Sequence, residues 1–265
     1  MKTAPGSQED RAAGTDRTGN LSGVGLLVGG RRIGGTERQI AYLAKGLAAR
    51  GVPTVLFFGS SREILSPNRE IAFPPAVPSY HLGADRAVRW RLDIGYRLGR
   101  LLLKHNLNVL HMFNLGSIEL GRLTLPFCPT VAGVAAVRCL RFTLEEVSRR
   151  RHLRALGANL PVSCNSQAIG DGLAALPGMD PGRISVILNG IELPPRPPTR
   201  SSLPPTVLFA GSLKAVKDPI TFARAIGLAA AQIPLRVMIA GDGPLADLVR
   251  STLASSMPAE SWQML

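Results

Sequence analysis

The stretch LSGVGLLVGGRRIGGTERQIAYLAKGLAARG, residues 21–51, holds a strand, a turn and a helix in that order. Its first part is an apolar run that ends at Gly29, which is typical of a short buried strand. A glycine-rich turn follows, and Thr36 with Glu37 then supplies a polar helix start. Apolar residues recur at helical spacing until Gly51 ends the helix. The stretch therefore predicts one strand–turn–helix unit.

The same alternation continues along the chain to residue 188. Further strands are predicted at 52–58, 108–113, 130–137, 160–163 and 184–188, with helices at 85–105, 117–124, 143–155 and 166–176 and a proline-containing loop at 60–80. Strands that alternate with helices predict an α/β fold with a mainly parallel sheet and helices on both faces.

A proline-rich segment then interrupts the pattern. ELPPRPPTRSSLPP, residues 192–205, holds six prolines and no periodic apolar face, which indicates a semi-rigid linker. After it we expect strands at 206–210 and 235–240, helices at 219–231 and 244–253, and no strand in the last residues, SMPAESWQML. The predicted organisation is a disordered tail (1–20), a Rossmann-like domain (21–190), a linker (191–205) and a partial second Rossmann-like domain (206–265).

Composition limits the partners of the chain. Its 265 residues carry a formal net charge of +13, which favours an acidic partner, although an arginine-rich surface explains the charge equally well. Aromatic residues make up 5% and are scattered, so the base-stacking pattern of a nucleic-acid binder is absent. No apolar stretch reaches ~18 residues. Cys128, Cys139 and Cys164 lack metal-ligand spacing, so we expect reduced core thiols of a cytoplasmic protein and no metal site.

Glycines gather where three predicted strands end. They lie at Gly29–Gly35, at Gly211 and at Gly241–Gly243. Glycines at strand ends let backbone amides approach a phosphate, and the following helix N-terminus adds positive potential. The first turn has the spacing of a P-loop, but Gly35 replaces the lysine that grips the phosphates, so nucleotide hydrolysis is not expected. The Gly-x-G-x-x-Gly fingerprint is also missing. A tight turn without any ligand remains the alternative.

Four segments in order resemble one family. GGTERQIAYLAKGLAARG (34–51), RISVILNGIE (183–192), VLFAGSLKAVKDPITFARAI (207–226) and LRVMIAGDGPLADLV (235–249) are similar to the family-4 retaining glycosyltransferases, which have the GT-B fold. The resemblance covers about residues 23–255. It implies transfer of a sugar from a nucleotide diphosphate to a glycan or lipid-linked acceptor of envelope polysaccharide synthesis, with retention at the anomeric carbon. It implies no cofactor beyond the nucleotide-sugar donor.

The resemblance also assigns roles to the strand-end residues. Gly34 and Gly35 would line the cleft near the donor diphosphate, Lys217 would pair with that diphosphate, and Gly241 and Gly243 would form the next turn around the donor. In the family, an arginine directly after the strand-end glycine assists this lysine, and here that position is Ser212. Lys214 could replace the arginine in part, although a lysine does not offer the two-pronged hydrogen bonding of an arginine.

Two residues of the first domain are candidate catalytic groups. The resemblance places a histidine or arginine after the strand at 130–137, where this chain has Arg138, a contact for donor phosphate or acceptor. The alternative for Arg138 is a surface arginine at a helix start. His111 lies late in its strand and either faces the cleft or is a satisfied core histidine.

The family's donor-binding pair of glutamates, separated by seven residues, has no counterpart after residue 206, where Glu260 is the only glutamate. We therefore expect a chain truncated within the donor-binding domain. The second hypothesis is accordingly a catalytically inactive glycosyltransferase-like protein.

The predicted helix at 85–105 mixes cations with apolar residues. Arginines such as Arg97 and Arg100 alternate with Tyr96 and Leu103. Such a helix can lie on anionic lipid, which would place the protein at the inner membrane face. The competing interpretation, which the pattern favours, is an ordinary helix with its apolar stripe in the core.

Overall fold

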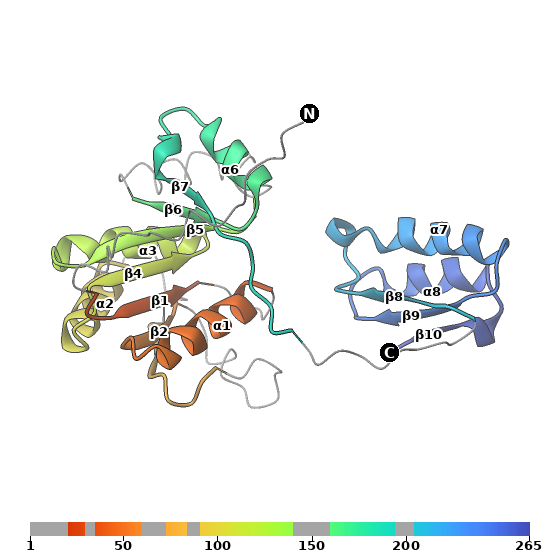
Figure 1. Cartoon of the computed structure of the whole chain (residues 1–265), viewed down its shortest axis with the longest axis horizontal. Helices are drawn as coiled ribbons and strands as arrows, with labels where there is room; N and C mark the ends of the chain where they lie inside the picture. Colours follow the sequence, from red (N-terminus) through yellow and green to blue (C-terminus); the bar gives the residue numbers. More distant parts are fainter. Residues whose placement is uncertain (1–20, 30–34, 60–72, 84–90, 140–159, 194–203) are drawn as a thin grey trace, which may run out of the picture. The chain divides into compact units, whose positions relative to one another are not determined.

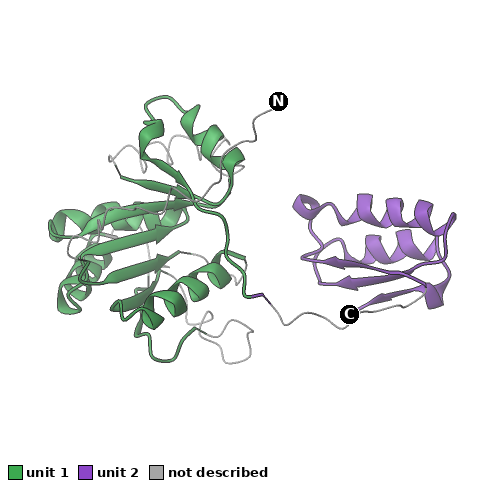
Figure 2. Cartoon of the chain, in the orientation of Figure 1, with its two compact units in different colours: residues 1–192 green, residues 193–265 purple. Residues whose placement is uncertain are grey.

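The computed structural model describes residues 21–29, 35–59, 73–83, 91–139, 160–193 and 204–265. The predicted tail 1–20, the predicted helix 143–155, most of the predicted linker and Gly34 lie outside the described residues. The chain divides into two compact units, residues 1–192 and residues 193–265 (Figure 2).

The first unit is built on a parallel sheet of seven strands in the order β3-β2-β1-β4-β5-β6-β7 (Figure 1). The strands are β1 (Val24–Val28), β2 (Thr54–Phe58), β3 (Ser79–His81), β4 (Val109–Phe113), β5 (Ala132–Val137), β6 (Val162–Cys164) and β7 (Ile184–Val186). Its α-helices are α1 (Gly35–Ala49), α2 (Arg91–Lys104), α3 (Leu115–Thr124) and α6 (Gln167–Ala174). The predicted parallel α/β fold is thus confirmed.

The two faces of this sheet carry separate cores. Buried side chains of α2, α3 and α6, such as Leu98, Ile118 and Leu173, pack with Leu27 and Met112 on one face. On the other face α1 packs on β1 and β2. Because successive residues of a strand point to opposite faces, Met112 turns to the first core, and its neighbours in β4 turn toward the α1 side.

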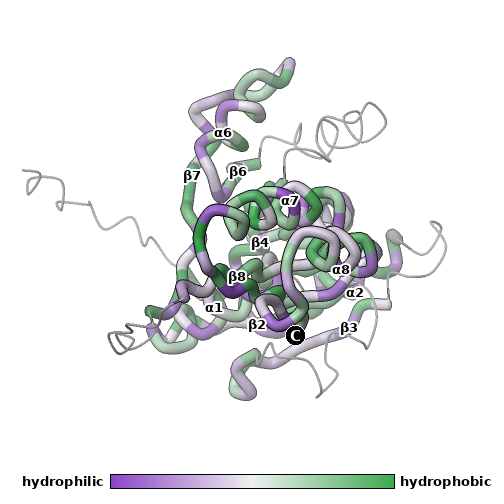
Figure 3. The backbone as a smooth tube through the Cα atoms, turned by 90° about the vertical axis from the view of Figure 1, so that its right-hand side faces the viewer, coloured by the Kyte–Doolittle hydropathy of each residue, from purple (hydrophilic) through white to green (hydrophobic). Residues whose placement is uncertain are grey.

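The second unit holds three parallel strands in the order β10-β9-β8. They are β8 (Thr206–Ala210), β9 (Arg236–Ala240) and β10 (Trp262–Met264), with helices α7 (Pro219–Ala230) and α8 (Ala246–Ala254). Figure 3 colours the backbone by hydropathy, and α7 carries much of the hydrophobic colour of this unit. Its core includes Leu213, Val237 and Leu253.

Three expectations were wrong. The loop predicted at 60–80 ends in strand β3, which pairs with β2, and the final segment contains β10, which pairs with β9. Both are three-residue edge strands, too short for an alternating pattern to be recognised. Cys128 and Cys164 are buried as expected, but Cys139 is exposed because it lies beyond the end of β5.

No helix among the described residues is both long and apolar enough to cross a membrane.

Candidate functional site

The carboxyl ends of the parallel strands form one edge of the first unit. Strands β1, β4, β5, β6 and β7 run in the same direction, so the residues at their ends lie along this edge. Ligands of open α/β sheets bind at this edge. Gly35 begins α1 and Arg138 directly follows β5, so both belong to it. A Cβ added at Gly35 would meet no atom within 4 Å, so packing does not require glycine there.

A pocket of about 520 Å³ lies beside α1. It contains both candidate catalytic residues of the sequence analysis. Its walls are largely apolar, and its lining residues are Gln39, Tyr42, Leu43, Gly46, Leu47, Arg50, His111, Arg138, Ser163, Cys164, Ile187, Leu188 and Gly190. These residues include two arginines and no carboxylate, so the pocket is positively charged.

His111 is a neutral side chain at the floor of this pocket. Burial, and secondly the positive charge of Arg138, lowers the pKa of His111 from 6.5 to about 4. Its Nε2 lies 3.3 Å from Oγ of Ser163, and its ring centroid is 4.2 Å from that of Phe113. His111 is therefore neither a fully enclosed core residue nor an exposed one. It lines the pocket.

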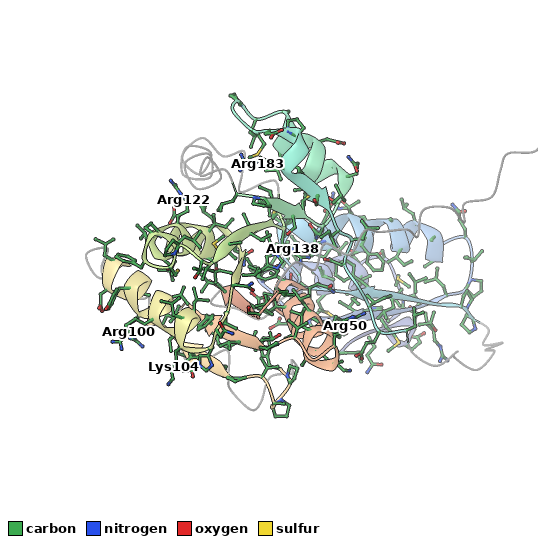
Figure 4. All side chains as sticks on the ribbon, turned by 60° about the vertical axis from the view of Figure 1, so that its left-hand side comes forward. Arg50, Arg100, Lys104, Arg122, Arg138 and Arg183 are labelled. Carbon is green, nitrogen blue, oxygen red and sulfur yellow. The ribbon has the colours of Figure 1, made fainter. Side chains whose placement is uncertain are left out.

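Arg138 is held at the pocket by two neutral groups. Its Nη1 donates a hydrogen bond of 2.5 Å to Oδ1 of Asn189, and its Cζ lies 5.5 Å from the centroid of the Phe113 ring. Burial lowers the pKa of Arg138, which still leaves the guanidinium charged at neutral pH. Figure 4 shows Arg138 near the middle of the unit, whereas Arg100 and Lys104 lie on the outer side of α2. Arg138 is thus a partly desolvated cation, not a free surface arginine.

The segment that follows β7 is attached to α1 and closes one side of the pocket. Gln39 exchanges two hydrogen bonds with the backbone of Gly190, at 2.8 and 3.0 Å. Farther along α1, Lys45 forms an ion pair with Glu192. These contacts hold Asn189, and through it Arg138, in place at the carboxyl edge.

The glycine turns of the second unit pack backbone against backbone. Gly211 follows β8, Gly241 and Gly243 follow β9, and Leu213 donates a 2.9 Å hydrogen bond to the carbonyl of Asp242. A Cβ at Gly241 would overlap the carbonyl of Gly211, and one at Gly243 would lie 2.5 Å from that of Leu213. Close packing of the two turns is therefore a sufficient reason for these glycines, whether or not a ligand approaches them.

The remaining donor-site candidates lie around the end of β8. Ser212 is half-buried, and Lys217 is exposed in the short 3-10 turn before α7. Asp218 caps α7 by accepting a hydrogen bond from the amide of Thr221. The Gly243 amide already donates to the Asp242 carboxylate at 2.7 Å, so this amide is not free for a phosphate.

Sequence patterns give no functional signal for two residues that contact the candidate catalytic groups. Asn189 accepts the hydrogen bond of Arg138, and Ser163, which lies in a predicted strand, contacts His111. Ser163 is the only hydroxyl residue of β6 and stands between Val162 and Cys164. Because successive residues of a strand point to opposite faces, the Ser163 side chain lies on the face of the sheet opposite to those two side chains.

No cluster of three or more histidine, cysteine or acidic side chains suited to a metal ion occurs within the described segments.

Comparison with known proteins finds one matching family model. A family model described as Glycosyltransferase Family 4 matches residues 33–193, more than half of the chain. A comparison with curated proteins found no match.

Solved structures show the same fold. The glycosyltransferase from Rickettsia africae ESF-5 superposes with a TM-score of 0.68 at 14% identity, covering 93% of this chain and 68% of that one. The Anabaena protein Alr3699/HepE in complex with UDP and glucose gives 0.68 at 12% identity, covering 92% and 69%. The lipopolysaccharide outer core galactosyltransferase WaaB gives 0.63 at 14% identity, covering 91% and 67%.

Proposed function

Because the chain belongs to glycosyltransferase family 4, we propose that it transfers a sugar from a nucleotide diphosphate donor to an acceptor hydroxyl, with retention at the anomeric carbon. The observation that carries this proposal is the family match over residues 33–193, the unit that contains the Arg138 pocket. The structure of Alr3699/HepE with UDP and glucose supports a nucleotide-sugar donor, and the galactosyltransferase WaaB supports a glycan acceptor.

The two units would share the work of the reaction. The first unit would hold the acceptor at its carboxyl edge, and the second would hold the donor diphosphate through Lys217 and the N-terminus of α7. As the acceptor oxygen bonds to the anomeric carbon, the bond between that carbon and the diphosphate breaks. The diphosphate leaves with the bonding electrons, and the acceptor proton passes to the departing diphosphate or to solvent. Lys217 would stabilise the negative charge that develops on this leaving group.

Donor binding tests the role of Lys217. Calorimetric titration of the 265-residue chain with UDP, GDP and ADP is expected to give a dissociation constant in the millimolar range, about 4 kcal/mol, for at least one nucleotide. Lys217→Ala should weaken it about tenfold or more, because a hydrogen bond to a charged group contributes about 1.5–3 kcal/mol. Arg250→Ala, which removes an exposed cation on α8, serves as the control. Equal binding by Lys217→Ala and Arg250→Ala would reject this donor site.

Sugar transfer distinguishes the transferase from its alternative. Release of nucleoside diphosphate from UDP-glucose, or from other nucleotide-sugars with a glycan acceptor, would support the transferase. The 265 residues contain no glutamate pair of the family type after residue 206. We therefore expect slow or undetectable turnover. Donor binding without turnover would support a catalytically inactive glycosyltransferase-like protein.

We also propose peripheral contact of α2 with anionic lipid at the inner membrane face. Ile94, Leu98 and Leu102 form the core stripe of this helix. The helix also exposes Leu92 (60%), Tyr96 (51%) and Leu103 (52%) beside Arg97, Arg100 and Lys104. Exposed apolar residues among cations suit a lipid surface, where each cation near the surface contributes about 1 kcal/mol.

Vesicle sedimentation tests this contact. The protein should pellet with vesicles of phosphatidylcholine and phosphatidylglycerol at low salt, and less at high salt. The double variant Arg97→Gln and Arg100→Gln should pellet less than Arg236→Gln and Arg250→Gln, which removes two exposed cations of the second unit. Absence of pelleting at low salt would reject the contact.

A further inference from the structure

The pocket beside α1 contains a positive charge, Arg138, that no carboxylate among its described lining residues neutralises. Arg138 is half-buried, and its contacts within the described part of the chain are the neutral amide of Asn189 and the ring of Phe113. A cation withdrawn from water without a carboxylate partner is destabilised, unless a ligand supplies the negative charge. Arg50 lines the same pocket and adds a second cation.

His111 lines the same pocket as Arg138, so a bound anion would interact electrostatically with both side chains. It shares the pocket with Arg138, and its single hydrogen bond within the described residues joins Nε2 to Ser163, so Nδ1 is not engaged. The other titratable or charged groups of the lining are Tyr42 and Arg50 on α1, Arg138 after β5 and Cys164 on β6. None of these is a carboxylate that would favour the protonated ring.

We infer that this pocket binds an anionic group, a phosphate, sulfate or carboxylate, between Arg138 and His111, and that His111 takes up a proton from solvent as the anion enters. In the empty pocket the protonated ring is disfavoured by burial and by repulsion from Arg138. An anion reverses the second effect and offers the ring a charged acceptor, so it favours the imidazolium. The apolar walls strengthen these interactions because they lower the local dielectric constant.

The inference names the kind of substrate that this site would accept. It rests on the proposed function in one respect, that the anion is part of the acceptor substrate. A neutral sugar acceptor would add no counter-charge to the neutral partners that Arg138 has among the described residues, whereas an acidic sugar or a phosphate-bearing acceptor would supply one. Affinity for such an acceptor should rise as the pH falls, since binding and protonation are linked.

The first experiment uses inorganic sulfate, because its charge does not change between pH 5 and 8. Calorimetry on the intact chain should show sulfate binding about threefold or more tighter at pH 5.5 than at pH 7.5. A histidine NMR titration should show the His111 pKa rising by about two units when sulfate is saturating, which is the shift that a threefold change of affinity requires. The His111 signal is assigned among the four histidines with the His111→Gln variant.

Variants separate the two parts of the site. Arg138→Gln should weaken sulfate binding about tenfold or more, whereas Arg236→Gln, which changes an exposed arginine on β9, should leave it unchanged. His111→Gln should still bind sulfate at pH 7.5 but lose the dependence on pH. Circular dichroism checks folding, and Arg138→Lys, which keeps the charge without the fork, replaces Arg138→Gln if the latter does not fold.

A second probe identifies the source of the anion. Hexyl sulfate that binds about tenfold or more tighter than sulfate would support a lipid headgroup, whose chain lies along the apolar walls. Equal binding would support an anion carried by a sugar or free in solution. The inference is overturned if the wild-type chain does not bind sulfate, if Arg138→Gln binds it as well as Arg236→Gln does, or if the His111 pKa does not move. None of these measurements involves a nucleotide-sugar, so failed sugar transfer leaves them unaffected.

Discussion

Acidification should destabilise the first unit through His111. In the folded chain the pKa of His111 is about 4 because of burial and the charge of Arg138, whereas in the unfolded chain it is near the ordinary 6.5. Between pH 6.5 and pH 4, His111 binds more protons in the unfolded state than in the folded state. The free energy of unfolding therefore falls as the pH falls through this range, and the contribution of His111 is fully retained above pH 6.5. The expected loss between pH 7 and pH 5 is about 2 kcal/mol from this residue alone.

The assay compares two proteins at each pH. Urea unfolding is followed by far-ultraviolet circular dichroism, which reports on the loss of the helices of the first unit. The same measurement on His111→Gln cancels the contribution of all other titrating groups. Between pH 7 and pH 5, the wild-type protein should lose about 2 kcal/mol more of its free energy of unfolding than His111→Gln loses. A difference that stays constant would show that His111 is not held neutral, and the electrostatic description of the pocket would be wrong.

Three further predictions concern packing and can be checked by chemical denaturation. Gly241→Ala should destabilise the second unit by about 3 kcal/mol, because the added Cβ would overlap the Gly211 carbonyl and the backbone φ is 149°. The control is Gly190→Ala, whose added Cβ would meet no atom within 4 Å. Equal destabilisation by the two variants would contradict the packing argument. Gly121→Ala should destabilise the first unit by about 1–3 kcal/mol through overlap with the flexible Met112 side chain, and an unchanged midpoint would disprove that contact. Ser166→Ala should lose about 1 kcal/mol with the cap of α6, an expectation that Ser166→Thr, which keeps a hydroxyl, should not share.

Sequence pattern alone was enough to identify the layered α/β fold. Strands such as 108–113 and helices such as 219–231 were located within two or three residues, because hydrophobic periodicity and capping residues are local signals. The strand-end glycines were equally visible. The reason for these glycines was not visible in the sequence. Gly241 must be glycine because the Gly211 carbonyl lies where its Cβ would be, and Gly211 is thirty residues away and becomes a neighbour only when β8 pairs with β9.

The pocket was decided by tertiary structure. The sequence left open whether His111 was a core or a cleft residue and whether Arg138 was a surface arginine. Pairing of β4, β5 and β6 brings His111 beside Ser163, and the hydrogen bonds of Gln39 with Gly190 bring Asn189 to Arg138. Charge state and burial depend on every neighbour in space, and these neighbours are separated by 52, 51 and 151 residues along the chain. A local pattern can therefore supply an arginine and a histidine, but only the folded chain makes the first a half-buried cation and keeps the second uncharged.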